Sequence, residues 1–215
     1  MADLRSAELA PLRALFFGDS LVAGVGDQSG AGWVGRVAAA CAARGWAITS
    51  YNLGVRRETS VQVASRLRAE AVPRIPTGAR ARIVVSVGAN DTTLERGRPR
   101  VAPGRSLEAL AGMLDQARAL GHDMLVVGPA PVRDDEQNAR IETLCAEYRL
   151  LCSERGSPFI AVFDSMRNSA VWMKEVATDD GAHPGARGYE LLARTLVGAG
   201  IVAWLVDGVL RDDSA

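Results

Sequence analysis

Short apolar runs alternate along this sequence with longer stretches of helical periodicity, and this alternation limits the folds open to the chain. Each run ends in Gly, Asn, Asp or Pro, residues that are typical of turns. The runs predict five strands, at residues 12–17, 47–53, 81–87, 124–127 and 159–163. The clearest is Ala81–Val87, which is rich in β-branched residues and nearly uncharged, as expected for a strand buried on both faces.

The stretches between these runs have apolar residues every three or four positions, which is typical of helices. They predict helices at residues 33–44, 59–71, 106–120 and 137–155, and a last helix that begins near 184 and ends near 206. Residues 92–103 and 166–177 are expected to be loops. Strands that alternate with such helices indicate βαβ units, a parallel sheet and helices on both of its faces. No linker interrupts the pattern, so we predict a single domain over residues 1–215.

The charges balance, since 25 lysines and arginines stand against 25 aspartates and glutamates. A chain without net charge offers no overall electrostatic attraction for nucleic acid or anionic membranes, so we expect neither as a partner. The segment Met1–Arg13 lacks the features of a signal peptide, and the apolar run Leu196–Val206 is too short to span a bilayer. We therefore expect a soluble, cytoplasmic protein. Nothing in the sequence specifies its oligomeric state.

Three cysteines, Cys41, Cys145 and Cys152, are present, with no C-x-x-C spacing. An odd and sparse set argues against a disulfide framework or a zinc site and suits a reducing compartment. Cys145 and Cys152 lie seven residues apart in a predicted helix, so we expect both to pack in the core.

Polar and small residues follow the predicted strands at the points where the strands end. In an open parallel sheet, functional groups gather at the carboxyl ends of the strands. The first strand is followed by Gly18-Asp19-Ser20, the second by Gly54 and the third by Gly88-Ala89-Asn90-Asp91, and a longer segment after the fifth leads to Asp180-Gly181-Ala182-His183. We therefore expect these residues to meet at one edge of the sheet.

Acyl transfer needs a nucleophile, a base, a group that orients the base, and donors for the oxyanion. Ser20 suits the first role and His183 the second. Asp180 precedes His183 by three residues, a spacing that lets its carboxylate accept a hydrogen bond from the imidazole, as in a Ser-His-Asp triad. The backbone amides of Ser20 and Gly54 and the side-chain amide of Asn90 suit the oxyanion hole.

Each of these residues also has an ordinary structural interpretation, as a turn residue or a helix cap. Their arrival at one sheet edge is what favours catalysis. Trp172 and Met173 precede the His183 turn, and they fit the lining of an acyl site and core packing equally well. His122 opens the fourth strand at the opposite edge, so we interpret it as structural.

Four blocks in this order resemble the SGNH hydrolases, also called GDSL esterases and lipases. They are Phe17–Leu21, Asn52–Val55, Val87–Asp91 and Asp180–Pro184. The resemblance implies a flavodoxin-like three-layer α/β/α sandwich with a five-stranded parallel sheet. It also implies a serine hydrolase that cleaves small-molecule carboxylic esters or thioesters through an acyl-enzyme, without metal or organic cofactor. The catalytic residues would be Ser20, Asp180 and His183, and the oxyanion hole would be formed by Ser20, Gly54 and Asn90.

The sequence departs from the family at Arg57, where similar proteins often have a glycine. Arg56, Arg57 and Glu58 either meet a polar or anionic substrate or are solvated loop charges. No long apolar lid is evident, which favours small or medium acyl groups. Two alternatives differ in function. One is an acyltransferase of the same family, and the other is a non-catalytic flavodoxin-like binding module.

Overall fold

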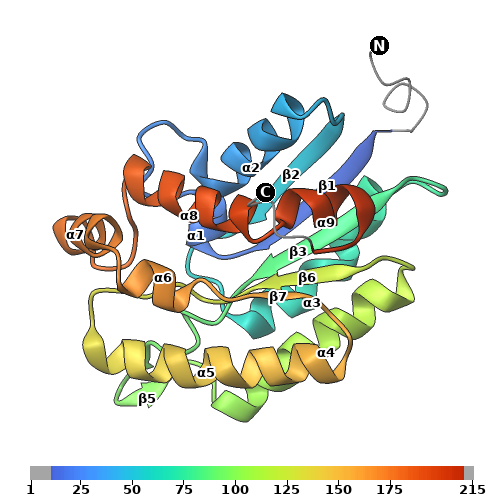
Figure 1. Cartoon of the computed structure of the whole chain (residues 1–215). Helices are drawn as coiled ribbons and strands as arrows, with labels where there is room; N and C mark the ends of the chain where they lie inside the picture. The colour runs from blue at the N-terminus through green and yellow to red at the C-terminus, as the bar shows by residue number, and fades with distance from the viewer. Residues whose placement is uncertain (1–10, 211–215) are drawn as a thin grey trace.

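The computed structural model describes residues 11–210, and its centre is a parallel sheet with the strand order β2-β1-β3-β6-β7 (Figure 1). The strands are β1 (Leu12–Gly18), β2 (Ile48–Gly54), β3 (Ala81–Ser86), β6 (Met124–Val127) and β7 (Phe159–Ile160). The predicted α/β fold with a five-stranded parallel sheet is thus confirmed. Residues 1–10 hold most of the segment for which we predict no signal peptide, and they lie outside the described residues, as do residues 211–215. A single domain over residues 1–215 therefore stays a prediction.

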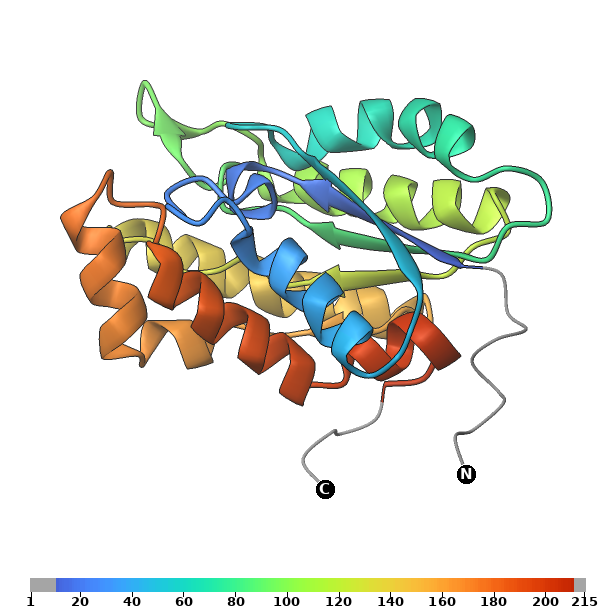
Figure 2. The same ribbon diagram turned by 90° about the horizontal axis from the view of Figure 1, so that it is seen from above.

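Helices cover both faces of the sheet (Figure 2). One face carries α3 (Ser60–Ala71), α4 (Pro103–Ala119) and α5 (Asp135–Glu154), and the other carries α2 (Gly32–Ala43), α8 (Ala186–Gly198) and α9 (Ile201–Asp207). The alternation of side chains along β1 separates the two cores. Ala14 and Phe16 pack with α2, α8 and α9, whereas Leu15 and Phe17 pack with α3, α4 and α5. The protein therefore has three layers, with the sheet between two layers of helices.

The three cysteines are buried and free, as expected for core residues. Burial raises the pKa of Cys152 to about 12 and that of Cys145 to about 11, although nearby Arg149 favours the Cys145 thiolate. Thiols with such pKa values hold almost no thiolate at neutral pH and are therefore poor nucleophiles.

The predicted last helix is two helices, so the prediction of one continuous helix over residues 184–206 is wrong. Gly200 separates α8 from α9 with a φ of 83°, in the left-handed region that ends a right-handed helix. Within residues 11–210 no single helix is long and apolar enough to cross a membrane, and α8 and α9 reach that length only as a pair bent by 54°.

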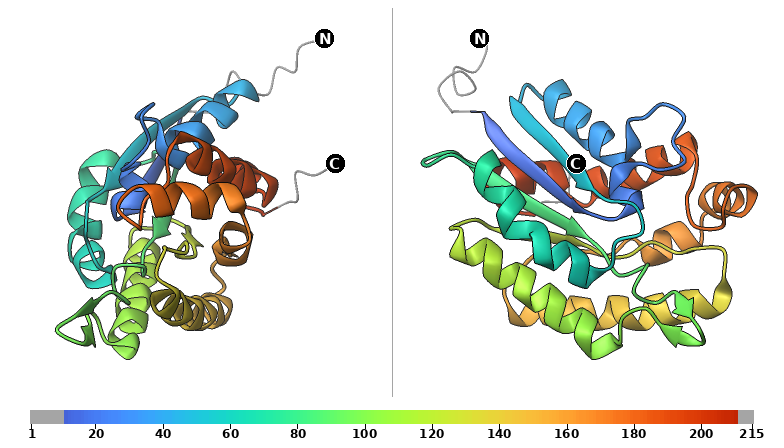
Figure 3. Two further views of the ribbon diagram at one scale, coloured as in Figure 1. Left: turned by 90° about the vertical axis from the view of Figure 1, so that its left-hand side faces the viewer. Right: turned by 180° about the vertical axis from the view of Figure 1, so that it is seen from behind.

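The segments predicted as loops contain regular structure. Residues 92–103 include a small antiparallel hairpin, β4 (Leu94–Glu95) and β5 (Arg98–Pro99), which projects beside α5 (Figure 3). Residues 166–177 fall largely within two short helices, α6 (Phe163–Arg167) and α7 (Ala170–Thr178). The fifth strand, β7, ends at Ile160, earlier than predicted, and the predicted last strand residue, Phe163, is the first residue of α6. These elements are too short for a periodic pattern to stand out in the sequence.

Candidate active site

Ser20 lies at the sharp turn where β1 gives way to the short helix α1 (Ser20–Ala23). Asp19 caps this helix, because its Oδ1 atom accepts a hydrogen bond of 2.9 Å from the Leu21 amide. Ser20 itself is the first residue of α1, and its amide has no acceptor one turn earlier within the helix. This turn therefore leaves the hydroxyl and the amide of Ser20 at the carboxyl edge of the sheet.

His183 and Asp180 lie in the turn between α7 and α8. His183 Nδ1 is 2.7 Å from Asp180 Oδ2, and Asp180 Oδ1 accepts from the amides of Ala182 and His183 at 3.0 and 3.1 Å. Partial burial works against the charge of Asp180, but the Ala182 amide and the hydrogen bond and charge of His183 outweigh it, so the pKa of Asp180 is lowered. The carboxylate is therefore ionised at neutral pH and fixes the orientation of the imidazole.

Asn90 follows β3, and its side chain is held between two neighbouring loops. Its Nδ2 atom donates to the Glu58 carbonyl at 3.0 Å and to Asp19 Oδ2 at 3.3 Å. The next residue, Asp91, is buried and accepts hydrogen bonds from Ser60 and Ser106, which lie in α3 and α4. The position of Asn90 thus depends on contacts that reach across the helical layer.

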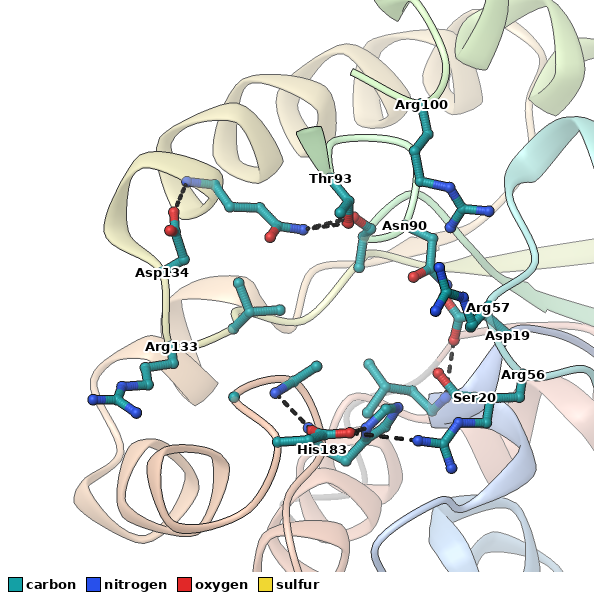
Figure 4. Close-up of a pocket in the computed structure, with 17 residues that line it drawn as sticks. Asp19, Ser20, Arg56, Arg57, Asn90, Thr93, Arg100, Arg133, Asp134 and His183 are labelled. Atoms are coloured by element: carbon teal, nitrogen blue, oxygen red, sulfur yellow. Dashed lines mark hydrogen bonds and ion pairs between the residues drawn. The ribbon is translucent and has the colours of Figure 1, made fainter. Parts of the chain in front are cut away.

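Ser20, Asn90, Asp180 and His183 line one cavity of about 680 Å³ (Figure 4). The cavity lies at the carboxyl ends of the strands, where the sequence predicts the site. Most of the residues that line it are polar or charged, and the apolar ones are few and small to medium in size. The described residues that complete the wall are Asp19, Leu21, Arg56, Arg57, Ala89, Thr93, Arg100, Val132, Arg133, Asp134, Gln137, Gly181 and Ala182.

Gly54 lies beside this cavity and is not among the described residues that line it. Its amide donates to Asn52 Oδ1 at 3.0 Å, and it pairs in register with Gly18 of β1. A Cβ atom at Gly54 would lie 2.2 Å from the Ala23 nitrogen, so a glycine is needed for α1 to pack this closely. The role of Gly54 as an oxyanion donor stays a prediction.

Asp19 is a feature of the site that sequence reasoning did not single out. Burial raises its pKa to about 7, with smaller contributions from the charges of Asp91 and Glu58, although the Leu21 amide favours the charged form. The Gly-Asp-Ser motif indicates a helix cap at this position, but the burial of the carboxyl group depends on loops distant in the sequence.

The structure also shows where the remaining candidate residues lie, namely Trp172, Met173 and the charged residues 56–58. Trp172 is fully buried and its Nε1 atom donates to the Pro131 carbonyl at 3.0 Å, while Met173 packs against the same core, so core packing is the correct interpretation of both. Arg56 and Arg57 line the cavity, whereas Glu58 pairs with Arg66 at 2.7 Å.

His122 lies two residues before β6 begins, at the opposite edge of the sheet from Ser20. Among residues 11–210, no three His, Cys, Asp or Glu side chains gather as the ligands of a metal ion would.

Comparisons with known proteins agree with this architecture. The sequence model of the GDSL-like lipase/acylhydrolase family matches residues 16–191, most of the chain. No curated protein sequence matches the chain. Among solved structures, a lipase/acylhydrolase from Enterococcus faecalis is similar with a TM-score of 0.70 and 22% identity, over 94% of this chain and 99% of that chain.

TesA is similar with a TM-score of 0.70 and 22% identity, over 86% of this chain and 96% of its own. The acetylxylan esterase Axe2 from Geobacillus stearothermophilus has a TM-score of 0.66 and 17% identity, over 86% of this chain and 92% of its own. At these identities the likeness concerns the fold. The match of the family model over most of the chain establishes the relationship: the protein belongs to the GDSL-like lipase/acylhydrolase family and is a carboxylic ester hydrolase.

Proposed function

We propose that the protein hydrolyses small-molecule esters or thioesters of small or medium acyl groups through an acyl-enzyme on Ser20. The observation that carries this proposal is the hydrogen bond between His183 Nδ1 and Asp180 Oδ2, in the cavity that Ser20 also lines. Because Asp180 engages Nδ1, the Nε2 atom of His183 is the nitrogen available to accept the Ser20 proton.

In the proposed mechanism, Ser20 Oγ attacks the substrate carbonyl while its proton moves to His183 Nε2. Asp180 stabilises the imidazolium that forms, and the amides of Ser20, Gly54 and Asn90 hold the oxyanion. For this, the Gly54 amide must turn from Asn52 Oδ1, and Asn90 must release its longer hydrogen bond, to Asp19 Oδ2. His183 then protonates the leaving alcohol or thiol, and Ser20 remains acylated. A water molecule activated by His183 attacks the acyl-enzyme and releases the acid. This sequence uses only groups of the chain and water, so no metal or organic cofactor takes part.

The residues that line the cavity support the proposal that the acyl group is small or medium in size. The apolar ones among them are Leu21, Ala89, Val132 and Ala182, which give an acyl chain only a short apolar contact. The acetylxylan esterase with the same fold is named for a short acyl group. Balanced charge supports a small molecule, rather than nucleic acid or a membrane, as the partner. We also propose a cytoplasmic location.

The test combines covalent labelling with turnover. A fluorophosphonate probe should label Ser20, and 4-nitrophenyl butyrate should be hydrolysed. Ser20→Ala should abolish labelling, and Ser20→Ala and His183→Ala should each lower kcat by about a thousandfold or more. Ser65→Ala and His122→Ala are matched controls, since Ser65 lies exposed on α3 and His122 lies at the far edge of the sheet. Labelling or turnover that survives in Ser20→Ala would refute the assignment of the nucleophile.

The same experiment separates the two alternatives. A non-catalytic binding module would show neither labelling nor turnover. An acyltransferase would form the same acyl-enzyme but pass the acyl group to an acceptor. Addition of alcohols during turnover, with analysis for ester products, distinguishes transfer from hydrolysis.

A further inference from the structure

One wall of the cavity carries three arginines that no part of the fold fully engages. Arg56 and Arg57 come from the loop between β2 and α3, and Arg100 follows β5 (Figure 4). Arg57 and Arg100 face the same carboxylate oxygen, Glu95 Oε1, at 3.9 and 3.2 Å. Arg56 lies 3.6 Å from Asp180 Oδ2, which already has His183 as its partner. We call Arg56, Arg57 and Arg100 the arginine wall.

The arginine wall has more positive charge than its acidic neighbours balance. Glu95 is the one carboxylate shared by Arg57 and Arg100, and the distance from Arg57 is too long for a hydrogen bond. A guanidinium carries five N–H donors, so most of the donors of Arg57 have no protein acceptor in the described structure. The wall therefore presents unused donors and surplus cationic charge to the cavity.

Arg66, in the neighbouring helix α3, shows how an arginine with a structural role is bound in this protein. It contacts Glu58 and Glu70 at 2.7 and 2.8 Å, and it donates to the Gly18 and Leu53 carbonyls at 3.2 and 2.7 Å. Its side chain is 16% exposed, whereas that of Arg57 is 77% exposed. Arg57 therefore contributes little to holding the fold.

The backbone of Arg57 is in a conformation that favours glycine. Its φ is 68°, and it is the third residue of a turn closed by a hydrogen bond of 3.2 Å from the Glu58 amide to the Val55 carbonyl. Glycine takes this place in a turn without strain, while an arginine there has a steric cost. An arginine that is strained, exposed and poorly paired, and that borders the cavity, indicates a ligand contact.

From this arrangement we infer that the natural ester carries an anionic group, a carboxylate or a phosphate, which binds Arg57 and Arg100 while the ester carbonyl lies at Ser20. The planar fork of a guanidinium matches the paired oxygens of both groups. The inference rests on the proposed function only in placing the ester carbonyl at Ser20. Arg56 adds charge to the wall but also touches Asp180, so it is not used in the test.

The test compares esters that differ only in charge. One pair is 4-nitrophenyl hydrogen adipate and its neutral methyl ester, with the charge on the acyl side. A second pair is 4-acetoxybenzoate and its methyl ester, with the charge on the leaving group. In one pair or both, wild-type kcat/KM for the anionic member should exceed that for the neutral member by about tenfold. The ratio should shrink as the salt concentration rises, because Arg56 and Arg57 are exposed to solvent. Turnover of 4-acetoxyphenyl phosphate relative to 4-acetoxybenzoate distinguishes phosphate from carboxylate.

Variants then test the residues. Arg57→Gly removes the charge and places glycine at a positive φ, so the fold is expected to persist. The kcat/KM ratio of anionic to neutral ester should fall about tenfold in Arg57→Gly, and by a similar factor in the separate variant Arg100→Gln. Arg96→Gly is the matched control, because Arg96 also has a positive φ, of 54°, but lies in the turn between β4 and β5 and outside the wall of the cavity. It should leave the ratio unchanged.

The outcomes separate this inference from the proposed function. A wild-type protein that cleaves charged and neutral esters equally, or a ratio that Arg57→Gly does not change, would overturn the inference and leave the hydrolase intact. Absence of both turnover and fluorophosphonate labelling would overturn the proposed function instead. In that case, calorimetric titration with 4-acetoxybenzoate still decides on the anion site. Binding that is lost in Arg57→Gly supports the site, and absence of binding refutes it.

Discussion

Asn90 Nδ2 lies 3.3 Å from Asp19 Oδ2, and this contact joins the loop after β3 to the residue that precedes the nucleophile. The donor is a proposed oxyanion group, and the acceptor is a buried carboxyl group with a pKa raised to about 7. The charge on Asp19 therefore bears both on the stability of the fold and on the position of Asn90.

The first prediction concerns the pH dependence of stability. Between pH 3.8 and about 7 the folded protein keeps a proton on Asp19 that the unfolded chain has released. The unfolding free energy should therefore fall as the pH rises through this window and level off above it. The difference is at most about 4 kcal/mol. Asp19→Asn should remove this decline, since the amide does not titrate.

Urea denaturation at pH 5 and pH 8 measures this effect for wild type and Asp19→Asn. The slope with pH is the informative quantity, because the loss of the Asn90 contact lowers the stability of the variant equally at both values. Asp115→Asn, a change of an exposed carboxylate in α4, serves as the control. A wild-type stability that does not fall between the two values would show that Asp19 is ionised throughout.

The second prediction concerns the orientation of His183. Asp180→Asn should lower kcat for 4-nitrophenyl butyrate by about a thousand- to ten-thousandfold, because an amide no longer enforces the tautomer with the proton on Nδ1. The lowered pKa of Asp180 has a separate effect on stability. Its contribution is present above the ordinary value of 3.8 and is lost as the pH falls through the lower folded value. Asp179→Asn, one residue away, is the control for the kinetic measurement. Equal losses of kcat in Asp180→Asn and Asp179→Asn would argue against the assignment of Asp180.

The third prediction concerns the buried hydrogen bonds of Asp91. Its carboxylate accepts from the Ser60 amide at 2.8 Å and from the Ser106 hydroxyl at 2.7 Å. Asp91→Ala should lower the unfolding free energy by about 3 kcal/mol, because buried donors lose their acceptor. It should also lower kcat more than it changes KM, since Asp91 anchors the loop that holds Asn90. Denaturation and kinetics with the same ester test both effects, and Asp115→Ala is the control. A stable variant with unchanged kcat would contradict the prediction.

The fourth prediction contrasts two glycines. An alanine at Gly54 would place its Cβ 2.2 Å from the backbone nitrogen of Ala23, a clash that no rotamer relieves. Gly54→Ala should therefore displace α1, lower the unfolding free energy by about 2–3 kcal/mol and reduce activity. Gly112 lies within α4, where a Cβ meets nothing within 4 Å. Gly112→Ala should raise the unfolding free energy by about 0.5–1 kcal/mol. Thermal and urea denaturation compare the two, and equal effects would show that α1 adapts to the added methyl group.

Much of the fold can be predicted from the sequence because long elements repeat their pattern many times. The strand Ala81–Ser86 and the helix Ser60–Ala71 each bury enough regularly spaced apolar residues for their type and place to be clear. The helix α7 is only nine residues long and buries only Trp172 and Val176. Two buried positions are too few for a helical period to be recognised in the sequence. The break at Gly200 was missed because apolar residues continue on both sides of it.

The sequence by itself determined the kind of fold and the residues that gather at one sheet edge, because strand ends and turn residues are local features of the chain. The tertiary structure decided how those residues are connected. The burial of Asp19, the contact of Asn90 with Asp19, and the arrangement of Arg57 and Arg100 beside one carboxylate depend on loops far apart in the sequence. Desolvation and charge act through space, so the electrostatics of the site emerge only when the chain is folded.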